Sequence, residues 1–424
     1  MRAWEANIRE VVPYVPGEQP KGGDIIKLNT NENPYPPAPG VAKALQEMNV
    51  DDLRKYPDPA ASVLVDALAE FHGLESNQVF VGVGSDDVLG MAFLTFFNSR
   101  KPILFPDISY SFYPVWADLF RIPYEMPALD GEYQIRKEDY FRENGGVIFP
   151  NPNAPTGILM PLSDVEAIVA HNQESVVIVD EAYIDFGGET ALPLMKQYEN
   201  LLVVRTFSKS RNMAGVRIGY AMGNSALIKA LNDVKYSYNS YTMNLPSLVM
   251  GAEAVKDVAY FESTLAKIIK TREEARVRLG ALGFTCLPSG ANFLFATHER
   301  VGAKEIFEAL KEKRMFVRYF NLPRIDNYLR ITIGTDEEME ALYGDVYKRQ
   351  APLRQHGDKL GSGNQTQGGH GHQRVHGQRD HRGVGGDRED YRRGEWNLRP
   401  DQRCRDPAAA ADRTGERRAE RRQI

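Results

Sequence analysis

The sequence lacks the features of a disulfide-rich, membrane or nucleic-acid-binding protein. Its 424 residues include only two cysteines, Cys286 and Cys404, which lie far apart in unlike surroundings. This argues against a disulfide framework and against a cysteine-rich metal site, and we expect no metal. No run of about 18 apolar residues and no apolar signal core occurs, so we expect a cytoplasmic protein without a membrane span. The formal charge of −5 gives no overall attraction to nucleic acid.

What is present is an ordinary globular composition followed by an abrupt change. The chain is 42% hydrophobic and 26% charged, and its length allows two domains and a large core. After about Gln350 it is rich in Arg, Gly, Gln, His and Asp, and Lys359 is its only lysine. Such a segment cannot bury enough apolar surface to fold. We expect residues 345–424 to be a disordered or non-native tail, for example one translated from a wrong frame; a basic tail that binds nucleic acid is the alternative.

Residues 1–344 alternate short apolar runs with helical patterns, which is typical of an α/β domain built on a mainly parallel sheet. We expect an N-terminal arm at residues 1–40, a large α/β domain at 41–248 and a smaller α+β domain at 249–344. The pattern is helical over about residues 249–282, and the last helix is expected to begin near Asp336 and to be cut short around Tyr343. The expected strands lie at residues 78–84, 102–105, 146–149, 176–179, 201–204, 214–221, 291–296 and 328–333.

Two of these strands each lead to a polar residue. The β-branched run 176–179 ends at Asp180, and the apolar run 201–204 is followed closely by Lys209. Ligands bind at the carboxyl ends of the strands in parallel sheets, so the acid and the amine would face one crevice. An aspartate that holds a protonated ring nitrogen and a lysine that forms a Schiff base are what pyridoxal phosphate requires. Alone, either residue also fits a structural role, as a turn aspartate or a solvated lysine.

The sequence also indicates a phosphate site, at the end of the strand expected at residues 78–84. Gly84, Ser85 and Asp86 begin a helix, where unpaired N–H groups and the helix dipole favour an anion. Arg217, eight residues after Lys209, can offer a bidentate contact to a phosphate. The helix start alone is a weak signal, because many turns share it.

Several further motifs occur in order along residues 1–344. They are Leu28-Asn29-Thr30-Asn31-Glu32-Asn33-Pro34-Tyr35, Tyr56-Pro57-Asp58-Pro59, Gly84-Ser85-Asp86-Asp87, Ser109-Tyr110-Ser111-Phe112-Tyr113, Asn151-Pro152-Asn153-Ala154-Pro155-Thr156-Gly157, Asp180-Glu181-Ala182-Tyr183, Ser208-Lys209 with Arg217, and Leu329-Arg330-Ile331-Thr332. With these motifs the chain resembles the fold-type I pyridoxal phosphate aminotransferases, and among them the histidinol-phosphate aminotransferase family. The first two motifs are the most telling for that family.

The resemblance implies a role at the cofactor for each matching residue. Lys209 would carry the covalent bond and shuttle the proton, Asp180 would pair with the pyridinium nitrogen, and Tyr183 would contact the ring oxygen. Tyr110 would stack on the pyridine face, although a core aromatic is an equal alternative without the family. The cofactor phosphate would be held by Ser85, Asp86, Ser208 and Arg217.

One position departs from the family pattern. The family usually has asparagine directly before Pro-Thr-Gly, where it hydrogen-bonds the cofactor's ring oxygen, and this sequence has Ala154 there. Either Asn153 substitutes from one residue earlier, or Tyr183 makes the contact alone.

The substrate and subunit contacts are also implied by the resemblance. Arg330 would grip the anionic end of the substrate, with Arg318, Tyr14 and Asn31 completing the pocket. Two arginines suit two substrates, because glutamate has two carboxylates and histidinol phosphate has a phosphate. Tyr56 would reach the cofactor phosphate across a subunit interface, which implies an obligate homodimer with shared active sites.

The implied activity is glutamate-dependent transamination in histidine biosynthesis. It would interconvert histidinol phosphate plus 2-oxoglutarate and imidazole acetol phosphate plus glutamate. A threonine-phosphate decarboxylase and an aromatic amino acid aminotransferase of the same fold are the enzymatic alternatives. The non-enzymatic alternative is a pyridoxal phosphate-binding ligand sensor, but such regulators resemble fusions to a DNA-binding domain, and only a short arm precedes Asn29 here.

Overall fold

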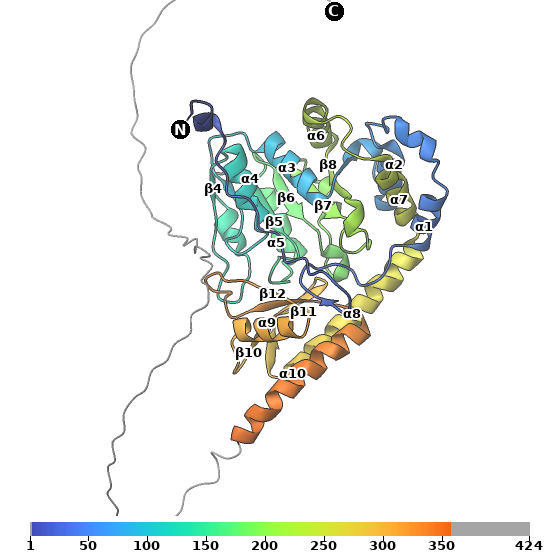
Figure 1. Ribbon diagram of the computed structural model, residues 1–424. Coiled ribbons are helices and arrows are strands. Elements are labelled where there is room, and N and C mark those ends of the chain that lie inside the picture. The colour runs from blue at the N-terminus through green and yellow to red at the C-terminus, as the bar shows by residue number, and fades with distance from the viewer. Residues whose placement is uncertain (1, 358–424) are drawn as a thin grey trace, which may run out of the picture. The chain divides into compact units, whose positions relative to one another are not determined.

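The computed structural model describes residues 2–357, and the side chains of residues 2–346. A seven-stranded sheet, in the order β2-β8-β7-β6-β5-β3-β4, forms the centre of the larger part (Figure 1). Only β8 runs antiparallel to its neighbours, which confirms the predicted, mainly parallel α/β sheet. The strands are β2 (Val79–Gly82), β3 (Ile103–Leu104), β4 (Tyr124–Glu125), β5 (Gly146–Pro150), β6 (Val177–Asp180), β7 (Leu201–Thr206) and β8 (Gly219–Gly223).

Both faces of this sheet are buried, because alternate side chains of its apolar strands enter two separate cores. Val177 and Val179 belong to one core, whereas Ile178 packs into the other. This explains why the central strands are continuous apolar runs rather than alternating ones. The covering helices are α1 (Pro39–Gln46), α2 (Ser62–His72), α3 (Ser85–Phe96), α4 (Phe112–Phe120), α5 (Leu162–His171), α6 (Ser225–Tyr238) and α7 (Leu245–Lys256).

The helical region expected from about residue 249 is divided into two helices. α7 ends at Lys256, and α8 (Val258–Ala281) begins after Asp257, whose carboxylate accepts a hydrogen bond from the backbone N–H of Tyr260. A side-chain cap of this kind starts a new helix where the helical pattern in the sequence runs on without interruption.

A smaller, antiparallel sheet in the order β12-β13-β10-β9 follows α8. Its elements are β9 (Phe284–Cys286), β10 (Phe293–His298), α9 (Ala303–Glu312), β12 (Arg318–Tyr319) and β13 (Leu329–Thr332). A separate parallel pair, β1 (Ile26–Lys27) with β11 (Met315–Phe316), joins the N-terminal segment to this region. The described residues belong to one compact unit, and the domain boundaries proposed from the sequence stay predictions.

The last described helix, α10 (Asp336–Gly357), runs beside α8 (Figure 1). Arg278 of α8 forms two hydrogen bonds with Glu340, at 2.7 and 3.0 Å. The sequence suggested that this helix stops near Tyr343, but it continues through the change in composition at residue 345. Residues 358–424 lie outside the described part, so both interpretations of the tail stay predictions. No helix in the described part is long and apolar enough to span a membrane.

Candidate active site

Asp180 and Lys209 lie at the same edge of the central sheet. Asp180 is the last residue of β6, and Lys209 follows the end of the adjacent parallel strand β7. The Nζ atom of Lys209 donates to the carbonyl oxygen of Thr30 at 3.0 Å and lies 5.8 Å from the centre of the Tyr183 ring. The structure therefore brings the predicted lysine, aspartate and tyrosine to one place, as expected for the carboxyl ends of neighbouring parallel strands.

The carboxylate of Asp180 is buried and held by two donors. Its Oδ2 atom accepts a hydrogen bond from the hydroxyl of Tyr113 at 2.9 Å, and its Oδ1 atom accepts from the backbone N–H of Ala182 at 3.2 Å. Burial raises the pKa of Asp180 to about 6, although both hydrogen bonds act in the opposite direction. A cation beside Asp180 would thus be strongly favoured. The sequence interpretation gave Tyr113 no role, although the residue lies in the quoted 109–113 motif.

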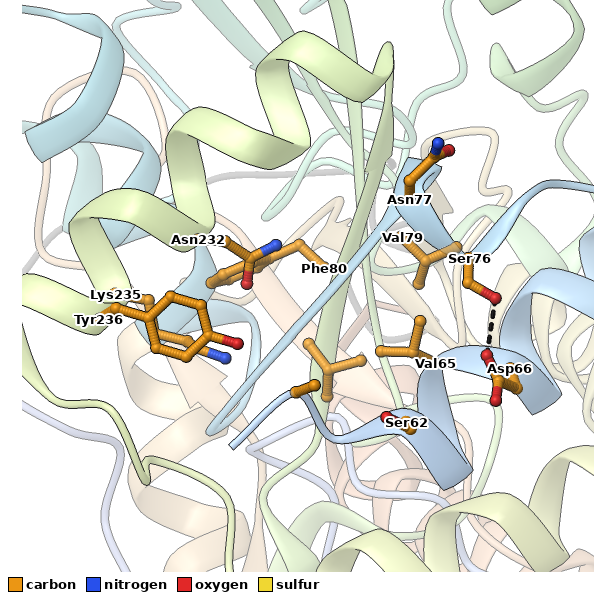
Figure 2. A pocket seen from close by; sticks show the side chains of 12 residues that line it. Ser62, Val65, Asp66, Ser76, Asn77, Val79, Phe80, Asn232, Lys235 and Tyr236 are labelled. Atoms are coloured by element: carbon orange, nitrogen blue, oxygen red, sulfur yellow. Dashed lines mark hydrogen bonds between the residues drawn. The ribbon is translucent and has the colours of Figure 1, made fainter. Parts of the chain in front are cut away.

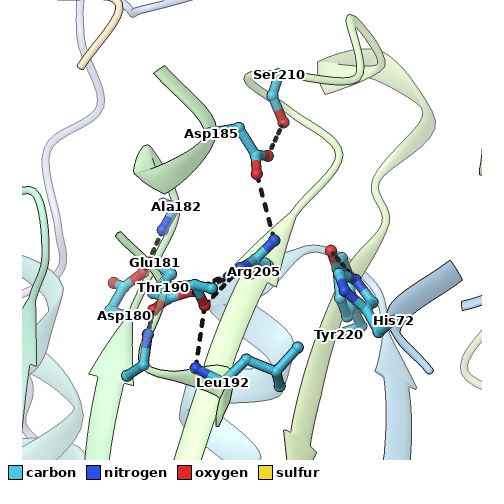
Figure 3. Close-up of polar contacts among 11 residues, drawn as sticks. His72, Asp180, Glu181, Ala182, Asp185, Thr190, Leu192, Arg205, Ser210 and Tyr220 are labelled. Atoms are coloured by element: carbon cyan, nitrogen blue, oxygen red, sulfur yellow. Dashed lines mark hydrogen bonds and ion pairs between the residues drawn. The ribbon is translucent and has the colours of Figure 1, made fainter. Parts of the chain in front are cut away.

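A buried ion-pair network lies next to these strand ends (Figure 3). Arg205 of β7 pairs with Glu181 at 2.9 Å and with Asp185 at 3.3 Å. Burial disfavours the charged form of Arg205, but the neighbouring carboxylates outweigh burial and raise its pKa. Asp185 also accepts a 2.6 Å hydrogen bond from the hydroxyl of Ser210. Because Ser210 directly follows Lys209, the network fixes the loop that carries the lysine.

The start of α3 forms a narrow cradle. The backbone of Gly84 has a φ of 84°, and a Cβ atom there would lie 2.5 Å from Nη2 of Arg217. Nη2 of Arg217 is 3.4 Å from Oδ2 of Asp86, whose Oδ1 atom accepts from the hydroxyl of Tyr110 at 2.6 Å. Ser85 is the first residue of the helix. The structure thus brings together four residues predicted at the cofactor, and their binding of phosphate stays a prediction.

Arg217 lies at this cradle in an irregular segment that precedes a strand. The strand predicted at residues 214–221 starts later than expected. Residues 214–216 form a single 3₁₀ turn, and Arg217 adopts a left-handed backbone with a φ of 60°. β8 then begins at Gly219, where a Cβ atom would lie 2.2 Å from the backbone carbon of Gly84. Ser208, which follows the end of β7, is also buried. Its Oγ atom accepts a hydrogen bond from the hydroxyl of Thr206 at 3.0 Å.

The loop before Pro-Thr-Gly is buried and internally bonded. The amide nitrogen of Asn153 donates to the carbonyl oxygen of Ile108 at 3.0 Å and to the hydroxyl of Thr156 at 3.1 Å. Both hydrogens of this amide are therefore engaged, one by Ile108 and one by Thr156 of the same loop. Ala154, also buried, has no side-chain donor. This geometry favours the second of the two sequence-based alternatives, in which Tyr183 contacts the ring oxygen without help from this loop.

Two arginines meet at the smaller sheet. Arg318 of β12 pairs in register with Arg330 of β13, and each guanidinium lies 5.6 Å from the centre of the Phe320 ring. Nη2 of Arg330 donates to the carbonyl oxygen of Asn29 at 3.1 Å, whereas its Nε is buried without a hydrogen-bond partner among the described residues. Burial lowers the pKa of Arg330, and the charge of Arg318 acts in the same direction. A buried cation with a free donor suits an anionic ligand.

Tyr14 connects this arginine pair with the predicted cofactor residues. Its ring stacks on Phe112 with the ring centres 4.1 Å apart, and the ring of Phe112 lies 5.6 Å from that of Tyr110. Burial lowers the pKa of Arg330, and the Tyr14 phenol acts in the opposite direction. The predicted substrate residues Arg330, Arg318 and Tyr14 are therefore gathered in one region. Asn31, predicted with them, instead has its side chain directed at the hydroxyl of Tyr183.

Tyr56 occupies a different surface. Its side chain is 81% exposed, and its ring stacks on Tyr241 with the centres 4.5 Å apart. A pocket of about 250 Å³ between α2, β2 and α6 lies beside the same segment (Figure 2). Lys235 in this pocket is buried and donates to the carbonyl oxygen of Pro59 at 2.7 Å, so it holds the Tyr-Pro-Asp-Pro motif against α6. None of the predicted site residues lines the pocket.

Comparison with known proteins decides the family. The class I and II aminotransferase family model matches residues 23–345. Histidinol-phosphate aminotransferase 1 of Hydrogenovibrio crunogenus is 53% identical over 350 residues, which are 82% of this chain and 98% of that protein. The protein of the same name from Methylococcus capsulatus is 52% identical and covers 80% and 95%.

The chain belongs to the class I and II aminotransferase family. Its resemblance to the histidinol-phosphate aminotransferases, predicted from the motifs, is confirmed. Among solved structures, this aminotransferase is similar to the histidinol-phosphate aminotransferase of Sinorhizobium meliloti in complex with pyridoxal-5'-phosphate. That match has a TM-score of 0.71 and 24% identity, and covers 77% of this chain and 91% of the other.

Other solved structures share the fold of this aminotransferase. The histidinol-phosphate aminotransferase of Clostridium acetobutylicum matches with a TM-score of 0.72 and 22% identity, covering 78% of this chain and 100% of that one. The L-threonine-O-3-phosphate decarboxylase of Porphyromonas gingivalis matches at 0.64 and 22%, covering 76% and 99%. At these identities the comparison establishes the fold alone, and it confirms the predicted fold-type I architecture.

Proposed function

We propose that this aminotransferase uses pyridoxal phosphate to exchange an amino group between histidinol phosphate and 2-oxoglutarate, giving imidazole acetol phosphate and glutamate. The observation that carries the proposal is the 52–53% identity to proteins named histidinol-phosphate aminotransferase over 95–98% of their length. The decarboxylase considered as a rival shares the fold at 22% identity. The place of the reaction is histidine biosynthesis.

The residues at the sheet edge fit the cofactor. Asp180 is a buried carboxylate with a raised pKa, so it favours a cationic partner such as a protonated pyridine nitrogen. When bound, the cofactor supplies a ring that withdraws the electrons released at the substrate's Cα. Lys209 would hold the aldehyde carbon and move the proton at that Cα, while Tyr183 would donate to the ring oxygen. Ser85, Asp86, Ser208 and Arg217 would hold the phosphate, and Tyr110 would cover the ring.

The arginine pair fits both substrates. Arg330 and Arg318 place two cations next to each other, and Arg330 keeps a buried N–H group free for a ligand. Such a pair would bind the two carboxylates of glutamate or the phosphate of histidinol phosphate, since each offers a double negative charge. Tyr14 would close over the same end of the substrate.

We also infer that the active enzyme is a homodimer with shared sites. Tyr56 is exposed, and its ring stacks on that of Tyr241, which is itself 46% exposed. An exposed aromatic pair of this kind is suited to contact with another chain. In a symmetric dimer each Tyr56 would be donated to the partner's phosphate site.

The activity is tested by mixing the purified protein, loaded with pyridoxal phosphate, with histidinol phosphate and 2-oxoglutarate. We expect glutamate to accumulate, at a rate that falls to background in Lys209→Ala and stays unchanged in the exposed-lysine control Lys229→Ala. Phosphothreonine and the aromatic amino acids serve as rival substrates. Release of carbon dioxide from phosphothreonine without glutamate formation from histidinol phosphate would overturn the assignment.

A further inference from the structure

The side chain of Asn31 is fixed between the smaller sheet and Tyr183. Its Nδ2 atom donates to the phenolic oxygen of Tyr183 at 2.9 Å. Its backbone N–H donates to the hydroxyl of Thr332 at 3.0 Å, and that hydroxyl lies 3.1 Å from Oδ1 of Asn31. The carbonyl oxygen of Asn31 accepts from Nδ2 of Asn292 at 3.1 Å. Asn31 is 1% exposed, so solvent does not compete for these contacts.

The direction of these hydrogen bonds can be derived from their chemistry. The hydroxyl of Thr332 accepts from the backbone of Asn31, so its own hydrogen is available for Oδ1. Oδ1 is then the acceptor of the amide, and its N–H group must face Tyr183. Because Tyr183 accepts at its phenolic oxygen, its single hydrogen is directed away from Asn31.

We propose that Asn31 is a positioning residue that keeps the hydroxyl hydrogen of Tyr183 directed at the ring oxygen of the cofactor. The inference rests on the proposed function, because it assumes pyridoxal phosphate beside Lys209. It matters in this chain because the side chain of Ala154 has no donor and both amide hydrogens of Asn153 are engaged, by Ile108 and by Thr156. Tyr183 is therefore left as the donor to that oxygen, and its orientation depends on Asn31.

The backbone at this position is adapted to asparagine. Asn31 has a φ of 55°, a left-handed conformation that asparagine and glycine tolerate better than most residues. Asn31→Gly therefore removes the amide without backbone strain. Thr332→Val keeps the shape of the side chain but removes the hydroxyl that orients the amide. Asn29→Gly is the matched control, because Asn29 is also buried but its amide donates to the carbonyl oxygen of Glu18.

The test is the pH midpoint of the visible absorbance change of the cofactor-loaded protein. A hydrogen bond from Tyr183 stabilises negative charge on the ring oxygen, and this favours loss of the proton shared with the nitrogen of Lys209. We expect Tyr183→Phe to raise the midpoint and Asn31→Gly to raise it by less, roughly half a pH unit to one unit. Thr332→Val should shift it in the same direction, and Asn29→Gly should leave it unchanged.

A double-mutant cycle separates positioning from a general structural effect. If Asn31 acts through Tyr183, Asn31→Gly or Thr332→Val adds no shift in the Tyr183→Phe background. Additive shifts, an unmoved midpoint, or an equal shift in Asn29→Gly would each overturn the inference. Failure of the proposed function looks different, because the protein would then show no cofactor absorbance or form no glutamate from histidinol phosphate.

Discussion

The carboxylate of Asp180 accepts a 2.9 Å hydrogen bond from the hydroxyl of Tyr113, and both side chains are buried. Two dipoles therefore hold the acid before any cofactor binds, and burial still raises its pKa to about 6. The site is thus built with an unfavourable charge that a cationic ligand would stabilise. The function we propose uses this charge, because an ionised carboxylate in a buried site strongly favours the protonated form of a pyridine nitrogen beside it.

The pH dependence of the apoprotein follows from this raised pKa. Between the ordinary value of 3.8 and about 6, folded Asp180 binds a proton that the unfolded chain has lost, so the free energy of unfolding falls as pH rises through this window. Asp180→Asn should remove this contribution and make the apoprotein more stable above that window, by up to about 3 kcal/mol. Urea unfolding at about pH 5 and about pH 8 measures it. Equal differences at the two pH values would contradict the buried-charge explanation.

Binding of pyridoxal phosphate should stabilise the wild type more than Asp180→Asn, which is the opposite of the order of stability expected for the apoproteins. In the loaded protein the ionised carboxylate of Asp180 gains a partner, so pyridoxal phosphate should raise the unfolding midpoint of the wild type more than that of Asp180→Asn. The measurement is the shift in melting temperature on adding the cofactor. Equal shifts in both proteins would show that Asp180 does not bind the ring nitrogen.

Substrate binding should depend on Arg330. Arg330→Ala removes a charge-assisted pair, so we expect the KM values for glutamate and histidinol phosphate to rise together by a factor that corresponds to about 1.5–3 kcal/mol. Arg300→Ala, at an exposed arginine paired with Glu299, is the control and should leave both values unchanged. A rise for one substrate alone would show that the two do not share this cation.

Shared sites make a specific prediction for mixed dimers. Lys209→Ala and Tyr56→Ala should each be nearly inactive alone. After the two are unfolded and refolded together, half of the dimers would be hybrids with one intact site, so about a quarter of wild-type activity should return. No recovery, in a mixture shown to contain hybrids, would place Tyr56 in the site of its own chain or outside the site.

The Arg205 network should contribute strongly to stability. Arg205→Met leaves the buried carboxylate of Glu181 without its cation, which costs about 3–5 kcal/mol. The double variant with Glu181→Gln should be less destabilised than Arg205→Met alone, because it no longer buries an unpaired charge. Denaturant unfolding of the apoproteins compares them. A double variant at least as unstable as Arg205→Met would show that the network stabilises through packing rather than charge.

The sequence predicted the sheet edge well because its signals are local. The runs ending at Asp180 and near Lys209 are buried strands whose apolar character follows from two covered faces. The strand expected from residue 214 was wrong in its first half, because residues 214–216 form a 3₁₀ turn and Arg217, whose side chain lies against Gly84, has a left-handed backbone. A contact between segments that are far apart in the sequence cannot be predicted from the local periodicity of apolar residues.

Residues that act through long-range contacts could not be found from the sequence. Tyr113, Arg205 and Asp185 look like ordinary aromatic or charged positions until the fold brings them to Asp180 and to the loop of Lys209. Asn31 was predicted from its motif, but its contact with Tyr183 spans 152 positions. The family resemblance supplied its location, and only the packing of the smaller sheet supplies its partner.

The most direct test of the account is reductive trapping of the cofactor. The protein loaded with pyridoxal phosphate is treated with borohydride and digested, and the peptides are weighed by mass spectrometry. We predict a single stable cofactor adduct on Lys209, with none in Lys209→Ala. An adduct on another lysine, or a wild-type protein that binds the cofactor without any trapped adduct, would contradict the assignment of the active site.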